Sequence, residues 1–435
     1  MFRNRYICFA LYNNNNGKTM DNKEQNNKEL ILAIFSGKDR PGISAAITET
    51  LAKHDVTILD IGQSDTHNHL TLGVLFAAES SISGTILKEL LFKANELNIF
   101  VTFRPVAPED YTNWVEAQGK NKYIVTLLAK QFTAEMVAAI TKEVAAQGMN
   151  IDALDRLTGR IPLIEQERVP KASIEISLRG NPRDREELQR RFMQVANHYQ
   201  VDISFQQDSM FRRMRRLICF DMDSTLIKTE VIDELAMRAG VGDKVAEITE
   251  RAMRGEIDFN ESFIERCALL EGLDVSVMRD IAENLPLMDG IERTMKILKK
   301  VGFKIAILSG GFTYFAKYLQ DRFGIDYVYA NELEVVDGKL TGRHLGDIID
   351  GKRKAELLRL IAQVEKVDIR QTVAVGDGAN DLPMISTAGL GIAFQAKPKV
   401  KESAKQSITT MGLDGILYFL GYKDSHLDEI EFSMF

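Results

Sequence analysis

The chain has 435 residues, of which 45% are hydrophobic and 27% charged. This composition is typical of a globular protein, and the length exceeds one ordinary core, so we expect two to four domains. The 55 basic and 62 acidic residues give a formal charge of −7, which argues against a protein-wide nucleic-acid footprint. No apolar run approaches the roughly 18 residues of a membrane span, so neither nucleic acid nor membrane is an expected partner.

The N-terminal residues and the cysteines indicate where in the cell the protein is expected. Residues 1–28 are rich in Asn and Lys and are predicted to be a disordered leader, within which Met20 is an alternative start. They lack the small-residue cleavage site of an export signal. The three cysteines form no CxxC pair, which predicts no disulfide framework and favours a cytoplasmic location.

The first block, 29–106, alternates apolar runs with helical patterns in the order β-α-β-β-α-β, the split βαβ arrangement. The expected strands are 30–36, 56–61, 70–76 and 99–104, with helices through Ile47 and Leu51 and over 86–97. A linker is predicted over 107–122, because 105–122 contains two prolines and the only tryptophan, Trp114.

The second block, 123–210, repeats this order of elements and therefore indicates a tandem duplication. Its expected strands are 123–129, 151–157, 172–178 and 201–206, and its expected helices are 134–147 and 183–199. A cluster of four arginines within 212–216 follows, and we interpret it as a solvated linker rather than a binding patch.

The third block, 211–425, alternates strands and helices in the manner of a doubly wound parallel sheet. Short apolar strands are expected at 217–220, 304–308 and 372–375. A long helical stretch, placed at about 230–286, is predicted to be an all-helical insertion. Residues 426–435 form an acidic tail.

Polar motifs follow these strands at the sheet edge where active sites of open α/β sheets gather. Asp221 and Asp223 follow the first strand, and their close negative charges become acceptable beside a bound cation. Alone, a Ser-Gly-Gly run is usually a turn and a Lys at a helix start is usually solvated, whereas three carboxylate or amide groups in six residues have little structural use. Together and in order they are highly specific. The other motifs are Ser309-Gly310-Gly311, Lys354 at a helix start, and the run from Gly376 to Asp381 that contains Asp377 and Asn380.

This set of groups matches the needs of phosphoryl transfer from a phosphate monoester. An aspartate can attack phosphorus, and a second carboxyl group can protonate the leaving oxygen and later activate water. Ser309, Gly310 and Lys354 can bind or neutralise phosphoryl oxygens. Mg²⁺ needs only one or two carboxylates, for which Asp221 and Asp377 are the natural pair, with a backbone carbonyl near Asp223.

The motifs resemble those of the haloacid dehalogenase superfamily, whose phosphatases carry D-x-D-x-T, Ser/Thr, Lys and G-D-x-x-x-D elements. Asp221, Asp223 and Thr225 match the first element, and Asp377 and Asp381 match the last. The resemblance implies that Asp221 is the nucleophile, Asp223 the general acid/base and Asp377 a metal ligand. It further implies that Asp381 orients the metal shell.

Within that superfamily the block from about 217 to 420 resembles the phosphoserine phosphatase family, in which a helical cap closes over the substrate. The resemblance implies that Glu230 binds the ammonium group, Arg266 the carboxylate, and that Asn380 also touches the substrate. A dipole-favoured helix charge would explain Glu230 alone, and a solvated helix residue would explain Arg266 alone. The expected reaction is hydrolysis of phosphoserine to serine, the last step of serine biosynthesis.

The two N-terminal blocks resemble ACT domains, ferredoxin-like modules that bind amino acids and pair across subunits. The resemblance rests on the run from Gly37 to Ile43, in which Asp39 and Gly42 mark a possible effector site. The equivalent place in the second block, 129–133, lacks this element. A homodimer with serine as regulator is implied. The predicted fold is therefore two βαββαβ ACT domains followed by an α/β haloacid dehalogenase-like domain with a helical cap.

Two other functions stay open at this point. One is a phosphatase or phosphotransferase of the same superfamily that acts on another small phosphate. A neutral substrate of that kind would not need both Glu230 and Arg266. The other is an amino-acid sensor with an inactive phosphatase domain, against which the complete set of acidic, serine and lysine residues argues.

Overall fold

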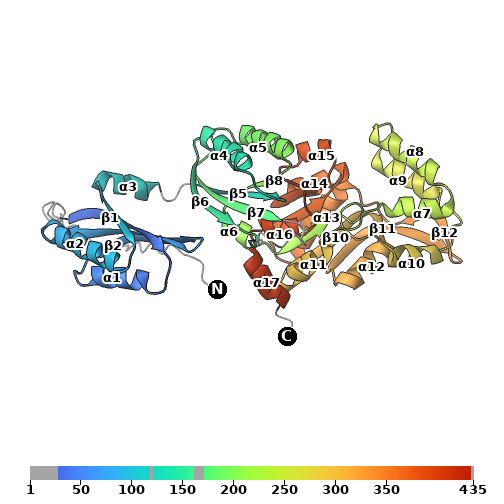
Figure 1. Cartoon of the computed structure of the whole chain (residues 1–435). Coiled ribbons are helices and arrows are strands. Elements are labelled where there is room, and N and C mark those ends of the chain that lie inside the picture. Colours follow the sequence, from blue (N-terminus) through green and yellow to red (C-terminus); the bar gives the residue numbers. More distant parts are fainter. Residues whose placement is uncertain (1–27, 118–120, 161–170, 433–435) are drawn as a thin grey trace, which may run out of the picture. The chain divides into compact units, whose positions relative to one another are not determined.

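The structure is a computed structural model that describes residues 28–117, 121–160 and 171–432 (Figure 1). The predicted leader lies outside these residues except for Lys28, as do Met20 and Cys8. The chain divides into two compact units, Met1–Gly119 and Lys120–Phe435, and each is described by itself.

The first unit is a four-stranded antiparallel sheet with two helices on one face. Its strands are β1 (Lys28–Lys38), β2 (Thr57–Thr66), β3 (His69–Glu79) and β4 (Phe100–Val106), in the order β2-β3-β1-β4. Its helices are α1 (Ile43–Ala52), α2 (Ser80–Glu96) and α3 (Pro108–Glu116). Alternate residues of β1, namely Ile31, Ala33 and Phe35, are buried in one core with α1 and α2. The β-α-β-β-α-β order is as predicted, and the expected linker contains α3.

The second unit begins with a module of the same topology. Its strands are β5 (Lys122–Ala129), β6 (Asn150–Arg156), β7 (Ala172–Arg179) and β8 (Asp202–Gln207), in the order β6-β7-β5-β8, and its helices are α4 (Ala134–Ala146) and α5 (Arg185–Tyr199). The short helix α6 (Met210–Arg213) leads from it into the larger sheet.

The rest of the second unit is built on a seven-stranded sheet in the order β12-β11-β10-β9-β13-β14-β15, parallel except for the β11–β12 pair. The strands are β9 (Leu217–Phe220), β10 (Lys304–Phe312), β11 (Tyr327–Val336), β12 (Lys339–Leu345), β13 (Thr372–Gly376), β14 (Leu390–Phe394) and β15 (Ser407–Ile408). The helices after the insertion are α11 (Ile291–Lys300), α12 (Thr313–Phe323), α13 (Gly351–Val364), α14 (Leu382–Thr387), α15 (Pro398–Ser403), α16 (Gly415–Phe419) and α17 (Asp424–Phe432).

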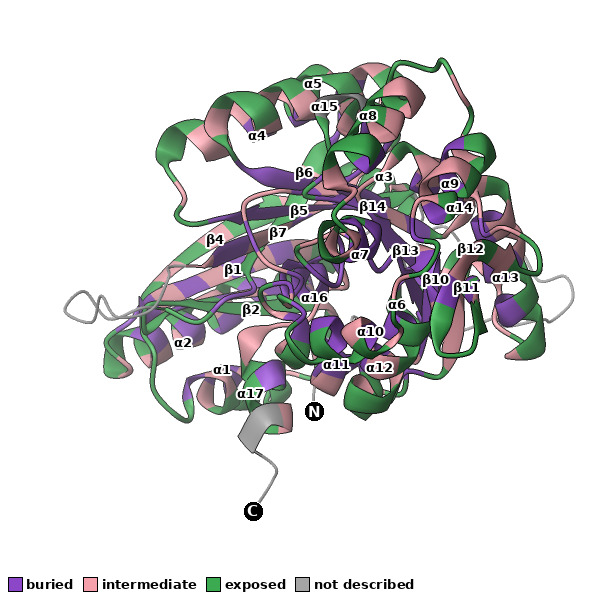
Figure 2. Ribbon diagram, turned by 90° about the vertical axis from the view of Figure 1, so that its right-hand side faces the viewer, coloured by how far each residue is buried: buried purple, intermediate pink, exposed green. Residues whose placement is uncertain are grey.

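Both faces of this sheet are covered, as the predicted doubly wound fold requires. Along β9, Ile218 and Phe220 belong to one hydrophobic core with α11 and α12, whereas Leu217 and Cys219 belong to a second core with α13 and α14. Figure 2 shows β10, β13 and β14 as buried strands. Continuous apolar runs therefore form these strands because side chains pointing to either face find a core.

The helical insertion comprises α7 (Val231–Ala239), α8 (Gly242–Met253), α9 (Phe259–Ala268) and α10 (Ser276–Glu283). We call these four helices the cap. Two chain segments connect it to the sheet domain, and they pair through the bridge between Ile227 and Leu287. The hairpin of β11 and β12, which the sequence analysis did not identify, contacts α9.

The second βαββαβ module is attached to the larger sheet domain through one face of β8. Ile203 and Phe205 point into the module's own core. The alternate residues Asp202, Ser204 and Gln206 are polar and are nevertheless buried, with exposed fractions of 2%, 0% and 5%. We call these three residues the polar seam.

The polar seam hydrogen-bonds to the segment that follows α15. The Asp202 carboxylate accepts four bonds of 2.6–2.9 Å, from the backbone N–H and the hydroxyl of both Thr409 and Thr410. The Ser204 hydroxyl donates to Gln406 Oε1 at 2.7 Å. Because every seam residue is satisfied, the module is an integral part of this unit.

The interpretation of the arginine cluster at 212–216 as a solvated linker was wrong. Arg212 is 7% exposed and pairs with Glu175 at 2.8 Å. Arg215 is equally buried and donates to Gln206 Oε1 at 2.7 Å. Burial lowers the pKa of Arg215 to about 9. Half of the cluster therefore lies inside the joint between module and sheet domain, which the run of charges did not indicate.

Two sequence-based expectations concern membranes and cysteines. Among the described residues, the helices lack the combination of length and apolar character that crossing a membrane requires. Cys219 and Cys267 are free and buried, in line with the prediction that no disulfide framework holds the fold.

Candidate active site

The catalytic loops meet at the carboxyl ends of β9, β10 and β13, which are adjacent in the sheet. Asp221 follows β9, is 5% exposed, and donates its backbone N–H to Val375 O at 2.9 Å. The close approach of the two strand ends brings the groups predicted from separate motifs into one site. The predicted sheet edge is thus where these side chains lie.

Lys354 connects two of these loops from the first turns of α13. Its side chain is fully buried, and its Nζ lies 2.9 Å from Asp221 Oδ2 and 2.6 Å from Asp381 Oδ1. Burial alone would lower the pKa of Lys354, but the two carboxylates outweigh it and hold that pKa above its usual range. Lys354 is therefore a fixed positive charge beside Asp221.

Three carboxylates form the predicted cation-binding group. Asp221, Asp377 and Asp381 each place one oxygen within 4.8 Å of the others. Burial, and then the Asp221 charge, raise the pKa of Asp377 to about 8 and that of Asp381 to about 7. The group is thus short of positive charge, which a hard cation with oxygen ligands would supply. The carboxylate of Asp223 is not part of this group.

Asp223 is placed to carry a proton. It is 7% exposed, and burial, followed by the charges of Glu230 and Asp221, raises its pKa well above the usual value. Its Oδ1 accepts the N–H of Val231 at 3.3 Å. Gly311 packs against it, since a Cβ at Gly311 would lie 2.3 Å from Asp223 Oδ2. A raised pKa favours the protonated form that a general acid needs.

Ser309 and Gly310 lie within β10, past its last regular pair at Leu308, and not in a loop after the strand as predicted. Ser309 is fully buried, and its Oγ accepts the N–H of Gly311 at 2.9 Å. Thr225, the last residue of the first motif, donates its hydroxyl to Asp377 Oδ1 at 3.3 Å. The second contact ties the loop after β9 to the loop after β13.

Glu230 and Arg266 come from the cap side of the site and influence each other electrostatically. Glu230 is exposed to solvent on one side. Burial of its carboxyl group by the surrounding residues raises its pKa, and the positive charge of Arg266 acts in the opposite direction. Ser224, held at a φ of +56°, donates its hydroxyl to Glu230 Oε1 at 2.8 Å. Arg266 Nε donates to Ser262 O at 3.2 Å. No ion pair joins Glu230 and Arg266 in the described part of the chain.

Asn380 and Phe259 complete the neighbourhood of the site. Asn380 is half-buried, with its side-chain oxygen against Gly378. Phe259, which the sequence analysis missed, starts α9 and covers Gly310: a Cβ there would lie 2.9 Å from the ring. Phe259 precedes Arg266 by two helical turns on one face. Helical spacing from Arg266 was therefore the signal that could have found it.

The possible effector site lies in the first unit. Gly42 has a φ of +95° at the start of α1, which is accessible mainly to glycine. Asp39 and Gly42 line a hollow of about 330 Å³, which Gln63 of β2 also lines. In the second module the equivalent α4 start is capped by Thr133, whose hydroxyl accepts the N–H of Met136 at 3.3 Å.

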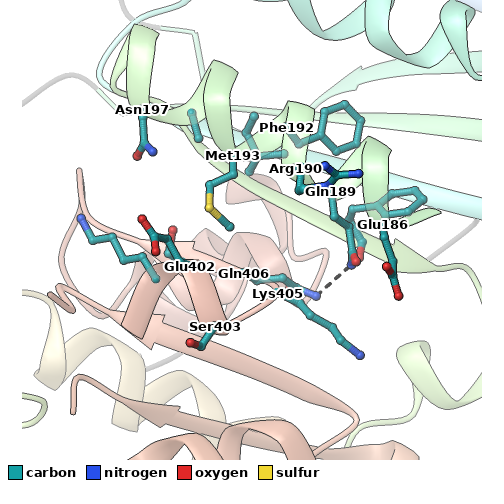
Figure 3. A pocket seen from close by; sticks show the side chains of 16 residues that line it. Glu186, Gln189, Arg190, Phe192, Met193, Asn197, Glu402, Ser403, Lys405 and Gln406 are labelled. Carbon is teal, nitrogen blue, oxygen red and sulfur yellow. Dashed lines mark hydrogen bonds between the residues drawn. The ribbon is translucent and has the colours of Figure 1, made fainter. Parts of the chain in front are cut away.

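A larger hollow of about 460 Å³ lies at the joint rather than at the catalytic loops. Figure 3 shows side chains of α5, such as Met193 and Arg190, facing Glu402 and Gln406 of the sheet domain. None of the motif residues lines it. Its size is thus no argument for catalysis there.

Comparisons with known families and proteins agree with this architecture. Residues 215–389 match the haloacid dehalogenase-like hydrolase family, and residues 29–104 and 122–206 each match an ACT domain family. The chain is 39% identical over 400 residues to the phosphoserine phosphatase of Streptomyces coelicolor, covering 90% of this chain and 92% of the relative. It is also 39% identical to phosphoserine phosphatase SerB2 of Mycobacterium tuberculosis, covering 91% and 93%.

Two solved structures are similar over about two thirds of the chain. The unliganded probable phosphoserine phosphatase of Vibrio cholerae aligns with a TM-score of 0.53 at 33% identity, covering 69% of this chain and 86% of that one. A HAD family hydrolase of Salmonella enterica aligns with a TM-score of 0.58 at 28% identity, covering 68% and 98%.

Proposed function

The chain belongs to the phosphoserine phosphatase family, and from that premise we propose that it hydrolyses O-phospho-L-serine to L-serine and phosphate, the last step of serine biosynthesis. One observation carries the proposal. A buried Asp221 lies beside the fixed charge of Lys354 and near a second buried carboxyl group, Asp223, whose pKa is raised, and Glu230 and the cap residue Arg266 lie on the cap side of this site.

The reaction proceeds in two steps on the chain's own residues. An Asp221 carboxylate oxygen attacks phosphorus, the bond to the serine oxygen breaks, and Asp223 gives its proton to that oxygen. Asp223, now a carboxylate, then takes a proton from the water that attacks the phosphorus of the aspartyl-phosphate. Phosphate leaves and the Asp221 carboxylate is restored. Ser309 and Lys354 compensate the charge on the phosphoryl oxygens in both steps.

The carboxylates of Asp221 and Asp377, with a backbone carbonyl near Asp223, would hold Mg²⁺, and Asp381 would orient its shell. The fit rests on the clustering of three carboxylates whose mutual repulsion the charge of Lys354 offsets only in part. Bound there, Mg²⁺ supplies positive charge to the phosphoryl group.

Substrate selection belongs to the cap side. Glu230 can pair with the ammonium group of phosphoserine and Arg266 with its carboxylate, while Asn380 reaches the substrate from the loop after β13. A substrate without either charge leaves both side chains without a partner, which costs binding energy. The pair therefore favours a phosphorylated amino acid over a sugar phosphate.

The two ACT modules have different proposed roles. The hollow beside Asp39 and Gly42 would take serine as a regulator, since the backbone N–H groups at a helix start suit a carboxylate. The second module lacks this element and is instead fixed to the sheet domain by the polar seam. Pairing of the ACT modules in a homodimer is proposed from the family, and cytoplasmic location remains a prediction from cysteine usage.

The test compares phosphate release from L-phosphoserine, phosphoglycolate and a sugar phosphate in the presence of Mg²⁺. Strong preference for phosphoserine is expected, and Arg266→Met should lower kcat/KM for phosphoserine about 100-fold, as for a lost charged contact. The same variant should leave turnover of a small aryl phosphate within about threefold. Equal losses on both substrates would contradict the assignment of Arg266 to the serine carboxylate.

A further inference from the structure

β10 breaks its pairing with β11 just where the catalytic serine lies. Leu308 is opposite Tyr329, and the next paired residue, Phe312, is opposite Asn331. Four residues of β10 therefore advance against two of β11. The segment between these pairs, Ser309 to Gly311, therefore holds two extra residues and bulges out of the ladder toward the site.

The side chain of Asn331 takes the place of the missing ladder. Its Nδ2 donates to Gly310 O at 2.8 Å, and its Oδ1 accepts the N–H of Ile349 at 2.8 Å. Asn331 is 2% exposed, so water does not compete for these bonds. One buried amide thus holds both the bulge in β10 and the segment that leads into α13, the helix of Lys354.

The hydrogen bond from Asn331 to Gly310 O affects Ser309 through one peptide group. Gly310 C=O and Gly311 N–H belong to the same planar unit, so holding the carbonyl fixes the direction of the N–H. That N–H is donated to Ser309 Oγ at 2.9 Å. Since Oγ already accepts a bond, its own hydrogen remains to be donated, and it has no acceptor among the described residues.

We propose that Asn331 is a positioning residue that makes Ser309 a hydrogen-bond donor to the phosphoryl group. It acts through the Gly310–Gly311 peptide and does not touch the substrate. The inference rests on the proposed phosphatase function but not on the identity of the alcohol, because the hydrogen bonds of Asn331 act only on the residues that would bind the phosphoryl group. Hydrogen bonds aligned in this way also polarise one another, which strengthens the final donor.

A double-mutant cycle between Asn331 and Ser309 tests the proposal. Asn331→Leu keeps the size of the side chain and removes both bonds without adding charge. We expect it to lower kcat about 10–100-fold, the usual cost of losing a group that orients a catalytic residue. In a Ser309→Ala background the same change should lower kcat less than about threefold, because its target is already absent.

The control is Asn284→Leu, which likewise removes an amide that donates to a backbone carbonyl, Asp280 O at 2.8 Å, on the exposed end of α10. It should leave kcat unchanged. Inhibition by inorganic phosphate should weaken in Asn331→Leu, while inhibition by L-serine stays constant, a difference that general loosening of the site would not produce.

Equal losses in both backgrounds, or no loss in either, would overturn the inference. If Asn331→Leu does not fold, Asn331→Ala goes through the same cycle, and failure of both to fold would also overturn a purely positioning role. If the wild-type enzyme hydrolyses a different phosphate monoester, the proposed substrate is wrong. The cycle is then measured on that ester, with the same expectation for Asn331.

Discussion

Replacing Asp202 by alanine tests whether the second ACT module is an integral part of the catalytic unit. The carboxylate is 2% exposed and accepts four hydrogen bonds from Thr409 and Thr410. Asp202→Ala leaves the two backbone N–H groups of these threonines without their partner at the joint. The hydroxyl groups can rotate toward other acceptors, so the backbone groups dominate the cost.

Each unsatisfied backbone N–H costs about 1–3 kcal/mol. Burial raises the pKa of Asp202, which shows that the native carboxylate itself carries a desolvation penalty that the alanine variant no longer has. The net loss in the free energy of unfolding is therefore about 2–4 kcal/mol. For a unit of about 300 residues this corresponds to a fall in Tm of about 3–6 °C.

Differential scanning calorimetry of the whole chain measures the effect. We expect one cooperative transition for the second ACT module together with the sheet domain, and this transition should move in Asp202→Ala. The control is Asp152→Ala, which removes a carboxylate of the same module that pairs with Arg179 on the surface and should cost less than about 1 kcal/mol. Separate transitions for the module and the sheet domain, or equal shifts in the two variants, would refute the reasoning.

Two further predictions concern the site. Gly311→Ala should lower kcat more than about 100-fold with little change in folding, since its Cβ would lie 2.3 Å from Asp223 Oδ2 and displace that acid. The control is Gly84→Ala, whose Cβ meets nothing within 4 Å and which should leave kcat unchanged. Similar kcat values for the two variants would contradict the role of Asp223. Without divalent cations, the folded-state pKa of about 8 for Asp377 lies above its usual 3.8, so the protein should lose stability as pH rises from 4 through 8. Mg²⁺ or Asp377→Asn should reduce this loss in thermal melts, and an unchanged pH profile in both would argue against the carboxylate group.

The sequence predicted the catalytic loops well because their signals are local. Asp221, Ser309 and Asp377 each follow a short apolar run, and parallel strands bring such positions to one edge. The order of elements in both ACT modules was likewise readable from alternating patterns. Lys354 was placed correctly for the same reason, since it opens a helix next to that edge.

The features that the sequence did not predict depend on contacts between segments that lie far apart in the chain. The alternation along β8 predicts a polar, exposed face, and periodicity cannot distinguish solvent from a neighbouring domain that satisfies Asp202. Arg215 was misinterpreted for the same reason. The proposed role of Asn331 depends on a bulge in the neighbouring strand β10, and no local sequence pattern predicts that bulge.

The most direct test of the central claim is to find where the phosphoryl group goes during turnover. The enzyme is mixed with phosphoserine and Mg²⁺, quenched with acid within one turnover, and its peptides are examined by mass spectrometry. The account predicts a phosphoryl group on the peptide containing Asp221, on Asp221 itself, and its absence in Asp221→Asn. Rapid turnover of phosphoserine with the label on another residue, or undiminished turnover by Asp221→Asn, would contradict the account.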